Sequence, residues 1–440
     1  MERDIMNQLL EWKENPDRKP LLITGVRQCG KTYVCREFGE KYFEDTAYFY
    51  FEGNKGLASV FDYDYDTDRI LDELGNIIRG KEIIPGKTLV IFDEIQACPA
   101  AVTALKYFCE NKKNLHIICA GSLLGVSLKR DHISFPVGKI ERLQMYPLTF
   151  SEFLRADGKQ SLIDGVKKYD LDKELPELYT GTLERELKYY YIVGGMPEAV
   201  LKWTRTHNIQ DVEKIQDEIL AGYGSDFAKY APLTDIPKLG WIWDSVPQQL
   251  ARENNKFIFS HVREGKRSHE LKDALQWLTD AGLLYRLELV PNPELPLSFN
   301  AIGSYFKVYM SDVGLLRRKS GISGKTILED SELYKNFKGA FTENYVMTEL
   351  KALKIHPYFW RSGNTAELDF LFENENEIIP VEAKAEVRTR AKSYRQFCKK
   401  YSPKKGFRFS MKNVGCNDVE NTKTYSLPLY LIWRLKEYLI

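Results

Sequence analysis

The first residues whose spacing suggests chemistry are two glycines, a lysine and a threonine near the start of the chain. Residues 21–32 read LLITGVRQCGKT, an apolar stretch followed by the pattern GxxxxGKT. The glycines let the backbone curl so that its N–H groups point inward, and such a loop before a helix cradles phosphates. The lysine would reach the β- and γ-phosphates of a nucleotide, and the threonine would hold Mg²⁺. The alternative is a chance glycine turn with a surface lysine. The residues predicted to contact nucleotide are Gly25, Val26, Arg27, Gln28, Cys29, Gly30, Lys31, Thr32 and Tyr33.

The elements around this loop must place it at one end of a sheet. Residues 21–24 predict a strand, and the sequence YVCREFGEKYF that follows the loop predicts a helix. Residues 88–92 form a continuous apolar run, typical of a buried parallel strand, whose carboxyl end is where ligands bind. Asp93 and Glu94 follow it directly. Asp93 would bind Mg²⁺ through water and Glu94 would polarise an attacking water. The alternative is an N-cap pair for the next helix.

Three further polar residues can approach the same phosphates. Ser122 ends a third apolar stretch, LHIICAGS, and either senses the γ-phosphate or caps the helix LLGVSL. Arg27 and Arg142 can each serve as an arginine finger or form a surface salt bridge. A dinucleotide-binding Rossmann site is disfavoured, because no GxGxxG follows the first strand.

Composition limits the class of protein. The chain of 440 residues is too long for one core and predicts two to four domains. Its formal net charge is +1, so any nucleic-acid surface must be local. The seven cysteines form no CxxC pair, which disfavours zinc and predicts reduced thiols in a cytoplasmic protein. No signal peptide and no membrane span are expected, because no apolar run approaches the roughly 20 residues that a span needs.

A second set of chemical residues lies in TAELDFLFENENEIIPVEAKAE, residues 365–386. Two apolar runs flank a polar turn and predict a β-hairpin. Glu382 and Lys384 are two residues apart on one strand, so they share a face, and Asp369 lies on the paired strand. Two carboxylates suit a hard cation that activates water, and the lysine would assist the nucleophile as a catalytic residue. This spacing is the PD-(D/E)xK arrangement of magnesium-dependent nucleases. The alternative is a set of solvated surface charges.

The residues that follow are locally basic. Residues 388–412 contain ten lysines and arginines and no acids, interleaved with tyrosine and phenylalanine. Such a stretch is either a solvated face or the electrostatic footprint of a nucleic-acid contact, and its position beside the hairpin favours DNA. Tyr394 and Gln396 can line the same cleft.

These motifs together resemble a known family. GVRQCGKT, IFDEIQ, AGSLLG and LQMYPLTFSEFL are similar to the bacterial and archaeal AAA+ (STAND-type) P-loop ATPases. The resemblance implies a helical lid, a winged helix and a C-terminal restriction-endonuclease-like domain of unassigned role. It also implies that Glu343 is the helix acid of a metal site with Asp369 and Glu382. A proline that often precedes the first acid is replaced here by Leu368. We therefore expect an α/β fold with an AAA+-type parallel sheet (1–158), lid (159–235), winged helix (236–300) and nuclease-like domain (301–440).

The middle of the chain offers weaker signals. The turn GGMPEAV restarts a helix at Pro197, and the resemblance implies that this proline packs near adenine; the alternative is a plain helix–turn–helix. Ser268 is expected to begin a helix and Gly282 to end it before a leucine-rich strand. The basic sequence HVREGKRSH either touches DNA phosphates or lies in an interdomain connector.

Two functions follow as hypotheses. In the first, ATP and Mg²⁺ bind at the loop, and hydrolysis controls a C-terminal domain that binds and possibly cleaves DNA. In the second, the chain is an ATP-dependent signalling or assembly switch whose C-terminal domain recognises protein. A homo-oligomer or a protein partner is compatible with both. ATP-driven translocation is a third possibility, but it needs a ring and a trans arginine that the sequence does not reveal.

Overall fold

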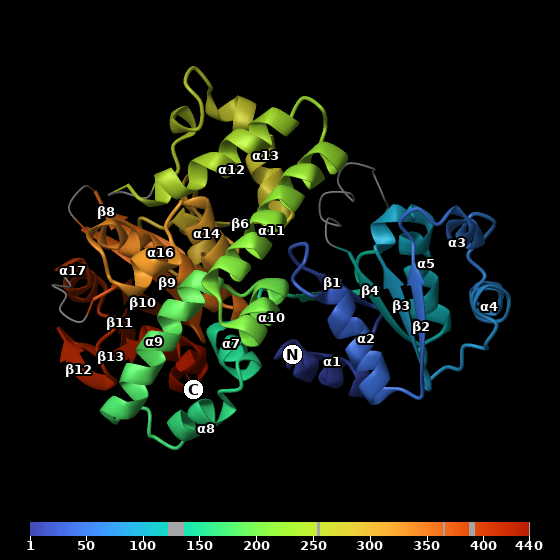
Figure 1. The fold of residues 1–440 in the computed structure, drawn as a ribbon, viewed down its shortest axis with the longest axis horizontal. Helices are drawn as coiled ribbons and strands as arrows, with labels where there is room; N and C mark the ends of the chain where they lie inside the picture. Colours follow the sequence, from blue (N-terminus) through green and yellow to red (C-terminus); the bar gives the residue numbers. More distant parts are fainter. Residues whose placement is uncertain (122–135, 253–255, 364–365, 387–391, 440) are drawn as a thin grey trace. The chain divides into compact units, whose positions relative to one another are not determined.

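The computed structural model describes residues 1–121, 136–252, 256–363, 366–386 and 392–439. The chain divides into two compact units, which are described separately. Unit 1 comprises 1–147 with 280–282, and unit 2 comprises 148–279 with 283–440. The α/β class with a parallel sheet is confirmed (Figure 1). No helix in the described residues is both long enough and apolar enough to cross a bilayer.

Unit 1 is built on a five-stranded sheet in which every pairing is parallel. The strand order is β2-β3-β4-β1-β5, so β1 and β3, which carry the two predicted phosphate-site motifs, lie on either side of β4. Every residue of β3 is buried, as the continuous apolar run predicted. The strands are β1 (Leu21–Thr24), β2 (Asp45–Tyr50), β3 (Thr88–Asp93), β4 (His116–Ala120) and β5 (Glu141–Gln144).

Helices pack on this sheet through apolar side chains. Phe49 and Phe92, on adjacent strands, join a core that extends to Leu105 and Phe108 of α5. Helix α2 begins directly at Lys31, so the loop before it closes on a helix N-terminus. Among the described residues, the helices of unit 1 longer than three residues are α1 (Ile5–Glu14), α2 (Lys31–Tyr42), α3 (Lys55–Ala58), α4 (Thr67–Asp72), a π-helical segment (Glu73–Arg79) and α5 (Pro99–Asn111).

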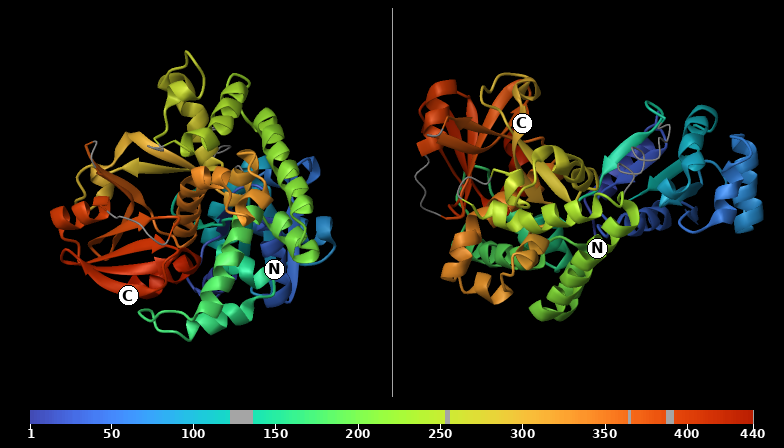
Figure 2. Two further views of the ribbon diagram at one scale, coloured as in Figure 1. Left: turned by 60° about the vertical axis from the view of Figure 1, so that its left-hand side comes forward. Right: turned by 90° about the horizontal axis from the view of Figure 1, so that it is seen from above.

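Unit 2 contains an eight-stranded mixed sheet in the order β12-β13-β11-β10-β9-β8-β6-β7. Its orange and red strands can be followed from two other directions in Figure 2. The predicted hairpin is present, since β9 and β10 pair antiparallel with Val381 opposite Phe370. The strands are β6 (Leu284–Leu289), β7 (Ile302–Met310), β8 (Tyr358–Ser362), β9 (Ala366–Asn374), β10 (Glu377–Ala383), β11 (Lys405–Ser410), β12 (Gly415–Val419) and β13 (Thr422–Pro428).

The helices of unit 2 fall before, between and after these strands. The longer ones are α9 (Glu177–Val193), α10 (Pro197–Thr206), α11 (Ile209–Tyr230), α12 (Ile236–Leu250), α13 (Ser268–Asp280), α16 (Glu332–Ala352) and α17 (Lys392–Tyr401). The shorter ones are α7 (Phe150–Ala156), α8 (Gln160–Lys167), α14 (Val313–Lys319), α15 (Gly324–Leu328) and α18 (Leu435–Leu439).

The sheet of unit 2 joins parts of the chain that the sequence assigned to different domains. Strand β6 lies in the range predicted for the winged helix, yet it pairs with β7 and, in parallel, with β8. Gly282, at a positive φ of 74°, follows α13 just before β6, as expected. The separate lid, winged helix and C-terminal domain stay predictions, because unit 2 contains all three stretches.

The GGMPEAV turn has a packing explanation within unit 2. The Gly195 N–H donates to Asp312 Oδ2 at 2.6 Å, and the Gly195 carbonyl accepts the Leu148 N–H at 2.6 Å. A Cβ at Gly195 would overlap Leu148 backbone atoms, so only glycine fits there. Pro197 is the first residue of α10, a position that suits proline. Its contact with adenine stays a prediction.

Candidate functional site

The loop between β1 and α2 has the backbone that its glycines predicted. Gly30 has a φ of 96° and Gln28 a φ of 65°, both in the left-handed region. A Cβ at Gly25 would overlap the carbonyl oxygen of Met145, so this position accepts only glycine. The loop therefore curls tightly before α2, with Lys31 as the first helical residue. This is the geometry in which successive N–H groups surround a phosphate.

The Lys31 ammonium lies inside this loop. The residue is 7% exposed, and its Nζ donates to the carbonyl oxygens of Gly25 and Val26, both at 2.9 Å. Cys29, fully buried, has its Sγ 4.0 Å from the same nitrogen. A cation held only by neutral carbonyls has no compensating anion in these contacts. Phosphate oxygens would supply that charge.

The two predicted Mg²⁺ residues meet directly. Thr32 Oγ1 donates to Asp93 Oδ2 at 2.8 Å, although the residues are 61 positions apart. The other carboxylate oxygen, Oδ1, accepts the Glu94 N–H at 3.0 Å. Asp93 is 3% exposed and lies at the carboxyl end of β3. A threonine hydroxyl beside a carboxylate suits Mg²⁺, which prefers oxygen ligands and keeps several waters.

Tyr48 joins this pair and was missed by the sequence reasoning. Its hydroxyl donates to Asp93 Oδ2 at 2.7 Å, and the Arg36 guanidinium carbon lies 3.9 Å from its ring centroid. Burial and the Asp93 carboxylate raise the pKa of Tyr48. No motif marked this residue, because it reaches Asp93 only through the parallel pairing of β2 with β3.

The remaining predictions around the loop have mixed outcomes. Glu94 follows Asp93 at a positive φ of 50°, and Gln96 Nε2 donates to its Oε2. Its side chain caps no helix, so the structure gives no support to the capping alternative. Tyr33 is 54% exposed on α2, and Arg142 is exposed on β5. Ser122 lies outside the described residues. The arginine-finger role of Arg27 or Arg142 stays a prediction.

In unit 2, Asp369, Glu382 and Lys384 converge as the hairpin predicted. Lys384 Nζ lies 3.0 Å from Asp369 Oδ2 and 3.0 Å from Glu382 Oε1. Asp369 Oδ2 also accepts the Ala383 N–H at 2.9 Å. Asp369 and Glu382 are 6% and 3% exposed, whereas the Lys384 side chain is 36% exposed. The set is thus a buried pair of carboxylates with a lysine at its accessible side.

Burial and the charges of neighbouring groups shift the pKa values of Glu382 and Lys384. Burial and the neighbouring Asp369 raise the pKa of Glu382 to about 8, against the opposing effect of Lys384. Burial lowers the pKa of Lys384, but Asp369 and Glu382 raise it by more, so it stays protonated. Among the described residues, Glu382 Oε2 is buried without a hydrogen-bond partner. A buried carboxylate oxygen without a partner is costly, and a cation would satisfy it.

Glu343 contacts Tyr309 and Lys307. Tyr309 on β7 donates its hydroxyl to Glu343 Oε2 at 2.8 Å, and Lys307 Nζ lies 3.4 Å from the same oxygen. Lys307 Nζ also lies 2.6 Å from Glu367 Oε1. The sequence reasoning missed Lys307, Tyr309 and Glu367. The alternation of Lys307 with Tyr309 along β7, and of Glu367 with Asp369 along β9, was the available signal.

The donor set limits the metals that unit 2 can hold. Across the residues that the structure describes, no group of three or more His, Cys, Asp or Glu side chains is arranged around one metal position. Asp369 and Glu382 provide two carboxylates, and Glu382 Oε2 is buried without a hydrogen-bond partner among the described residues. Mg²⁺ is commonly bound by one or two carboxylates plus waters and phosphate, so these two residues fit it. The role of Glu343 as a third ligand stays a prediction.

Residues 392–401 of the basic stretch form α17. Tyr394, Phe397 and Cys398 point into the core, and the Tyr394 hydroxyl lies 3.0 Å from Thr424 Oγ1. The prediction that Tyr394 lines a cleft is therefore wrong, since the residue is fully buried. The exposed positions on the helix are Lys392, Arg395, Gln396, Lys399 and Lys400. Four of these five carry positive charge, so the outer face of α17 is basic.

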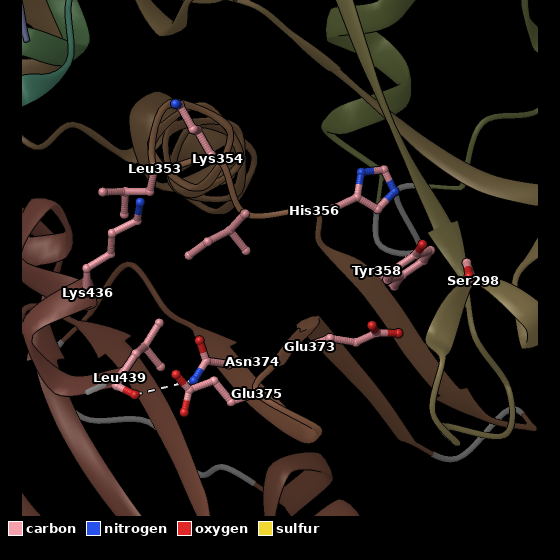
Figure 3. A pocket seen from close by; sticks show the side chains of 11 residues that line it. Ser298, Leu353, Lys354, His356, Tyr358, Glu373, Asn374, Glu375, Lys436 and Leu439 are labelled. Carbon is pink, nitrogen blue, oxygen red and sulfur yellow. Dashed lines mark hydrogen bonds between the residues drawn. The ribbon is translucent and has the colours of Figure 1, made fainter. Parts of the chain in front are cut away.

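A pocket of about 630 Å³ opens at the other end of the hairpin (Figure 3). Its lining combines Lys354 and Lys436 with Glu373 and Glu375, and Asn374 Nδ2 donates to the Leu439 carbonyl at 3.3 Å. The pocket contains none of the predicted site residues. It adjoins the turn that begins β10, whereas Lys384 follows the last residue of β10.

Comparison with family models divides the chain in three. Residues 17–154 match the model described as AAA domain, which includes both phosphate-site motifs. Residues 17–154 are a P-loop AAA domain. Residues 184–326 and 338–430 match two models described as domains of unknown function, DUF8612 and DUF4143. The second of these contains Glu343, Asp369, Glu382 and Lys384. No protein of curated function matches the chain.

Three solved structures match this chain at low sequence identity and low TM-score. A Walker-type ATPase of Pyrococcus abyssi, PABY2304, is 15% identical with a TM-score of 0.44, covering 72% of this chain and 95% of that one. The Aeropyrum pernix ORC2 protein is 13% identical with a TM-score of 0.37, covering 74% and 91%. Thermotoga maritima RuvB is 13% identical with a TM-score of 0.31, covering 68% and 90%. Each TM-score is below 0.5, so we infer nothing about this chain from these three proteins.

Proposed function

We propose that this chain is an ATP-dependent protein that acts on nucleic acid. In this proposal the AAA domain binds and hydrolyses ATP with Mg²⁺, and unit 2 binds DNA and cleaves its backbone. The observation that carries the ATP part is the 2.8 Å contact between Thr32 and Asp93 at the mouth of the glycine loop. The observation that carries the DNA part is the placement of Lys384 between Asp369 and Glu382.

In the AAA domain, each residue has a distinct task. The N–H groups of 25–32 would surround the phosphates, and Lys31 would exchange its two carbonyl contacts for β- and γ-phosphate oxygens. Thr32 and Asp93 would hold Mg²⁺, which neutralises charge on the phosphates. Glu94 would orient the attacking water. Ser122 and Pro197 are proposed to contact the γ-phosphate and the adenine.

In unit 2, Asp369 and Glu382 would hold a divalent cation, which supplies a more acidic bound water. Lys384 is the accessible member of the set and would contact the scissile phosphate or its attacking water. Its ammonium lies 3.0 Å from both carboxylates, so it would act there as an electrostatic stabiliser of the phosphate. The basic outer face of α17 supports DNA as the polymer, because such a face attracts the phosphate backbone.

Cleavage is tested with plasmid and linear DNA, in Mg²⁺ or Mn²⁺, with and without ATP. We expect nicked or linear product from the wild type and none from Lys384→Ala. Lys335→Ala is the matched control, because Lys335 is an exposed lysine of unit 2 whose ammonium pairs with Glu332, three residues away on α16. DNA left whole under all these conditions contradicts the nuclease part. ATP binding is tested with Lys31→Ala, for which we expect at least about tenfold weaker nucleotide binding.

The salt dependence of DNA binding separates the two hypotheses about partners. Phosphate contacts release counterions, so the logarithm of the binding constant should fall steeply with the logarithm of salt concentration. A flat dependence, or no binding, would instead favour an ATP-dependent switch that recognises protein.

A further inference from the structure

Four acids of unit 2, Glu343, Glu367, Asp369 and Glu382, form a cluster with two lysines. Lys307 is the more deeply buried of these lysines. The residue lies on β7 and is 1% exposed. Its Nζ lies 2.6 Å from Glu367 Oε1 and 3.4 Å from Glu343 Oε2. Lysines are almost never fully buried unless paired, because an isolated ammonium loses its hydration. Here one lysine compensates two carboxylates from two different elements, α16 and β9.

Other side chains complete this end of the cluster. The Tyr309 hydroxyl donates to Glu343 Oε2, and Arg361 Nε lies 3.6 Å from Glu367 Oε2. Glu343 and Glu367 therefore already have charged or hydrogen-bonding partners supplied by the chain. A metal ion at this position would have to displace a buried ammonium, which has no route to solvent comparable with that of Lys384.

The opposite end of the cluster differs in two respects. The Lys384 side chain is 36% exposed, so its ammonium can move toward water when a cation arrives. Glu382 Oε2 has no hydrogen-bond partner among the described residues, although the residue is 3% exposed. A cation could take this oxygen without breaking a hydrogen bond of the described residues.

We propose that the cluster takes a single divalent cation, at Asp369 and Glu382, and that Lys307 is a built-in cation at Glu343 and Glu367. This inference rests on the metal site proposed above. Lys307 is a positioning residue: it holds two carboxylates where a second metal ion would otherwise bind. A two-ion mechanism, which needs a pair of metals about 4 Å apart, is then closed to this site. The substrate phosphate would meet one metal ion and Lys384.

The number of bound ions tests the proposal. The probe is Mn²⁺, counted from the loss of its free signal in electron paramagnetic resonance. The full chain carries Asp93→Asn and is kept free of nucleotide, so that the AAA domain contributes no site. We expect one Mn²⁺ per chain, and none after Glu382→Gln. Two Mn²⁺ per chain overturn the inference and leave the metal site itself intact. No bound Mn²⁺ overturns the metal site of the proposed function as well.

The role of Lys307 is tested by Lys307→Met, which keeps an unbranched side chain only one atom shorter and removes its charge. Glu343 and Glu367 then lack their cation, so we expect a second Mn²⁺ to bind and a larger increase in melting temperature with Mn²⁺ than in the parent. Lys335→Met is the control and should stay at one ion. A folded Lys307→Met protein that still binds one ion overturns this role.

If Lys307→Met does not fold, a second variant tests where the ion binds. Glu367→Gln removes one carboxylate of the Lys307 pair but none of the proposed ligands. The number of Mn²⁺ ions bound per chain should stay at one. Loss of the ion in Glu367→Gln would place it beside Lys307 and contradict the proposal.

Discussion

The Tyr48 hydroxyl lies 2.7 Å from Asp93 Oδ2, the same oxygen that accepts the Thr32 hydroxyl at 2.8 Å. Tyr48 thus holds the carboxylate that is proposed to bind Mg²⁺. We predict that Tyr48→Phe weakens the binding of Mg²⁺–nucleotide about tenfold, since a hydrogen bond to a charged acceptor is lost. Nucleotide binding without Mg²⁺ should be unchanged. Titration with a fluorescent nucleotide, with and without Mg²⁺, measures both.

The matched control for this substitution lies two residues further along the same strand. Tyr50 is 43% exposed and donates its hydroxyl to Glu52 Oε2 at 2.9 Å. Tyr50→Phe removes the same hydroxyl without touching Asp93. Equal effects of the two substitutions on Mg²⁺–nucleotide binding would contradict the role of Tyr48.

Gly25→Ala should weaken nucleotide binding by the AAA domain. The added Cβ would overlap the Met145 carbonyl oxygen, so the loop must shift away from Met145. We expect at least tenfold weaker nucleotide binding, or about 1.4 kcal/mol, by isothermal titration calorimetry. Gly56→Ala is the control, because the nearest atom to its Cβ is 3.8 Å away. Unchanged affinity in Gly25→Ala would mean that the loop adapts.

The buried His116 should make the stability of unit 1 depend on pH. Burial lowers the pKa of His116 to about 4, and its ring packs edge-on against Trp12 and Phe43. The unfolded chain, with a pKa near 6.5, binds more protons than the folded chain between pH 6.5 and 4. The contribution of His116 to the free energy of unfolding is therefore fully present above pH 6.5. It is lost as pH falls, by up to roughly 3 kcal/mol at pH 4.

Replacing His116 by leucine should remove this loss. Urea midpoints at pH 7 and pH 5 would then differ less in His116→Leu than in the wild type. His269→Leu, at an exposed position of α13, serves as the control. An equal acid dependence in wild type and His116→Leu would assign it to other groups.

Asp312 ties two segments of unit 2 together. Its Oδ1 accepts the Leu315 N–H at 2.8 Å as the N-cap of α14, and its Oδ2 accepts the Gly195 N–H. Asp312→Ala leaves both donors buried and unpaired, which should cost about 3 kcal/mol in unfolding free energy. Ser323→Ala, at the exposed N-cap of α15, should cost about 1 kcal/mol. Equal effects would show that the Gly195 hydrogen bond adds nothing.

The outer face of α17 should contribute to the salt dependence of DNA binding. Replacing Lys399 and Lys400 with glutamine should reduce the slope of log K against log salt by about 1 for each phosphate that is no longer neutralised. Lys325→Gln, which removes an exposed lysine from α15, should leave the slope unchanged. A slope that does not change in the double variant would exclude this face from the DNA-binding surface.

The parts of the molecule that the sequence predicted are those in which the chemistry is local. The glycine loop, its lysine and threonine lie within eight residues, and the hairpin acids are joined by one turn. Tyr48 and Lys307 could not be predicted in this way, because the pairing of β2 with β3 and the approach of β7 to α16 decide what they touch. Tyr394 is a different case. Its spacing with Phe397, Cys398 and Tyr401 already indicated an inward face of a helix.

The eight-stranded sheet of unit 2 also determines how the protein can be divided for experiments. Strand β8 is covered on one side by β6, which comes from the middle of the chain, and on the other by β9. A fragment beginning at residue 301 would keep β8 but lack β6, leaving β8 with unpaired N–H and C=O groups. Such an edge invites self-association. A soluble nuclease-like fragment should therefore start before β6, and aggregation of shorter ones would say nothing about their chemistry.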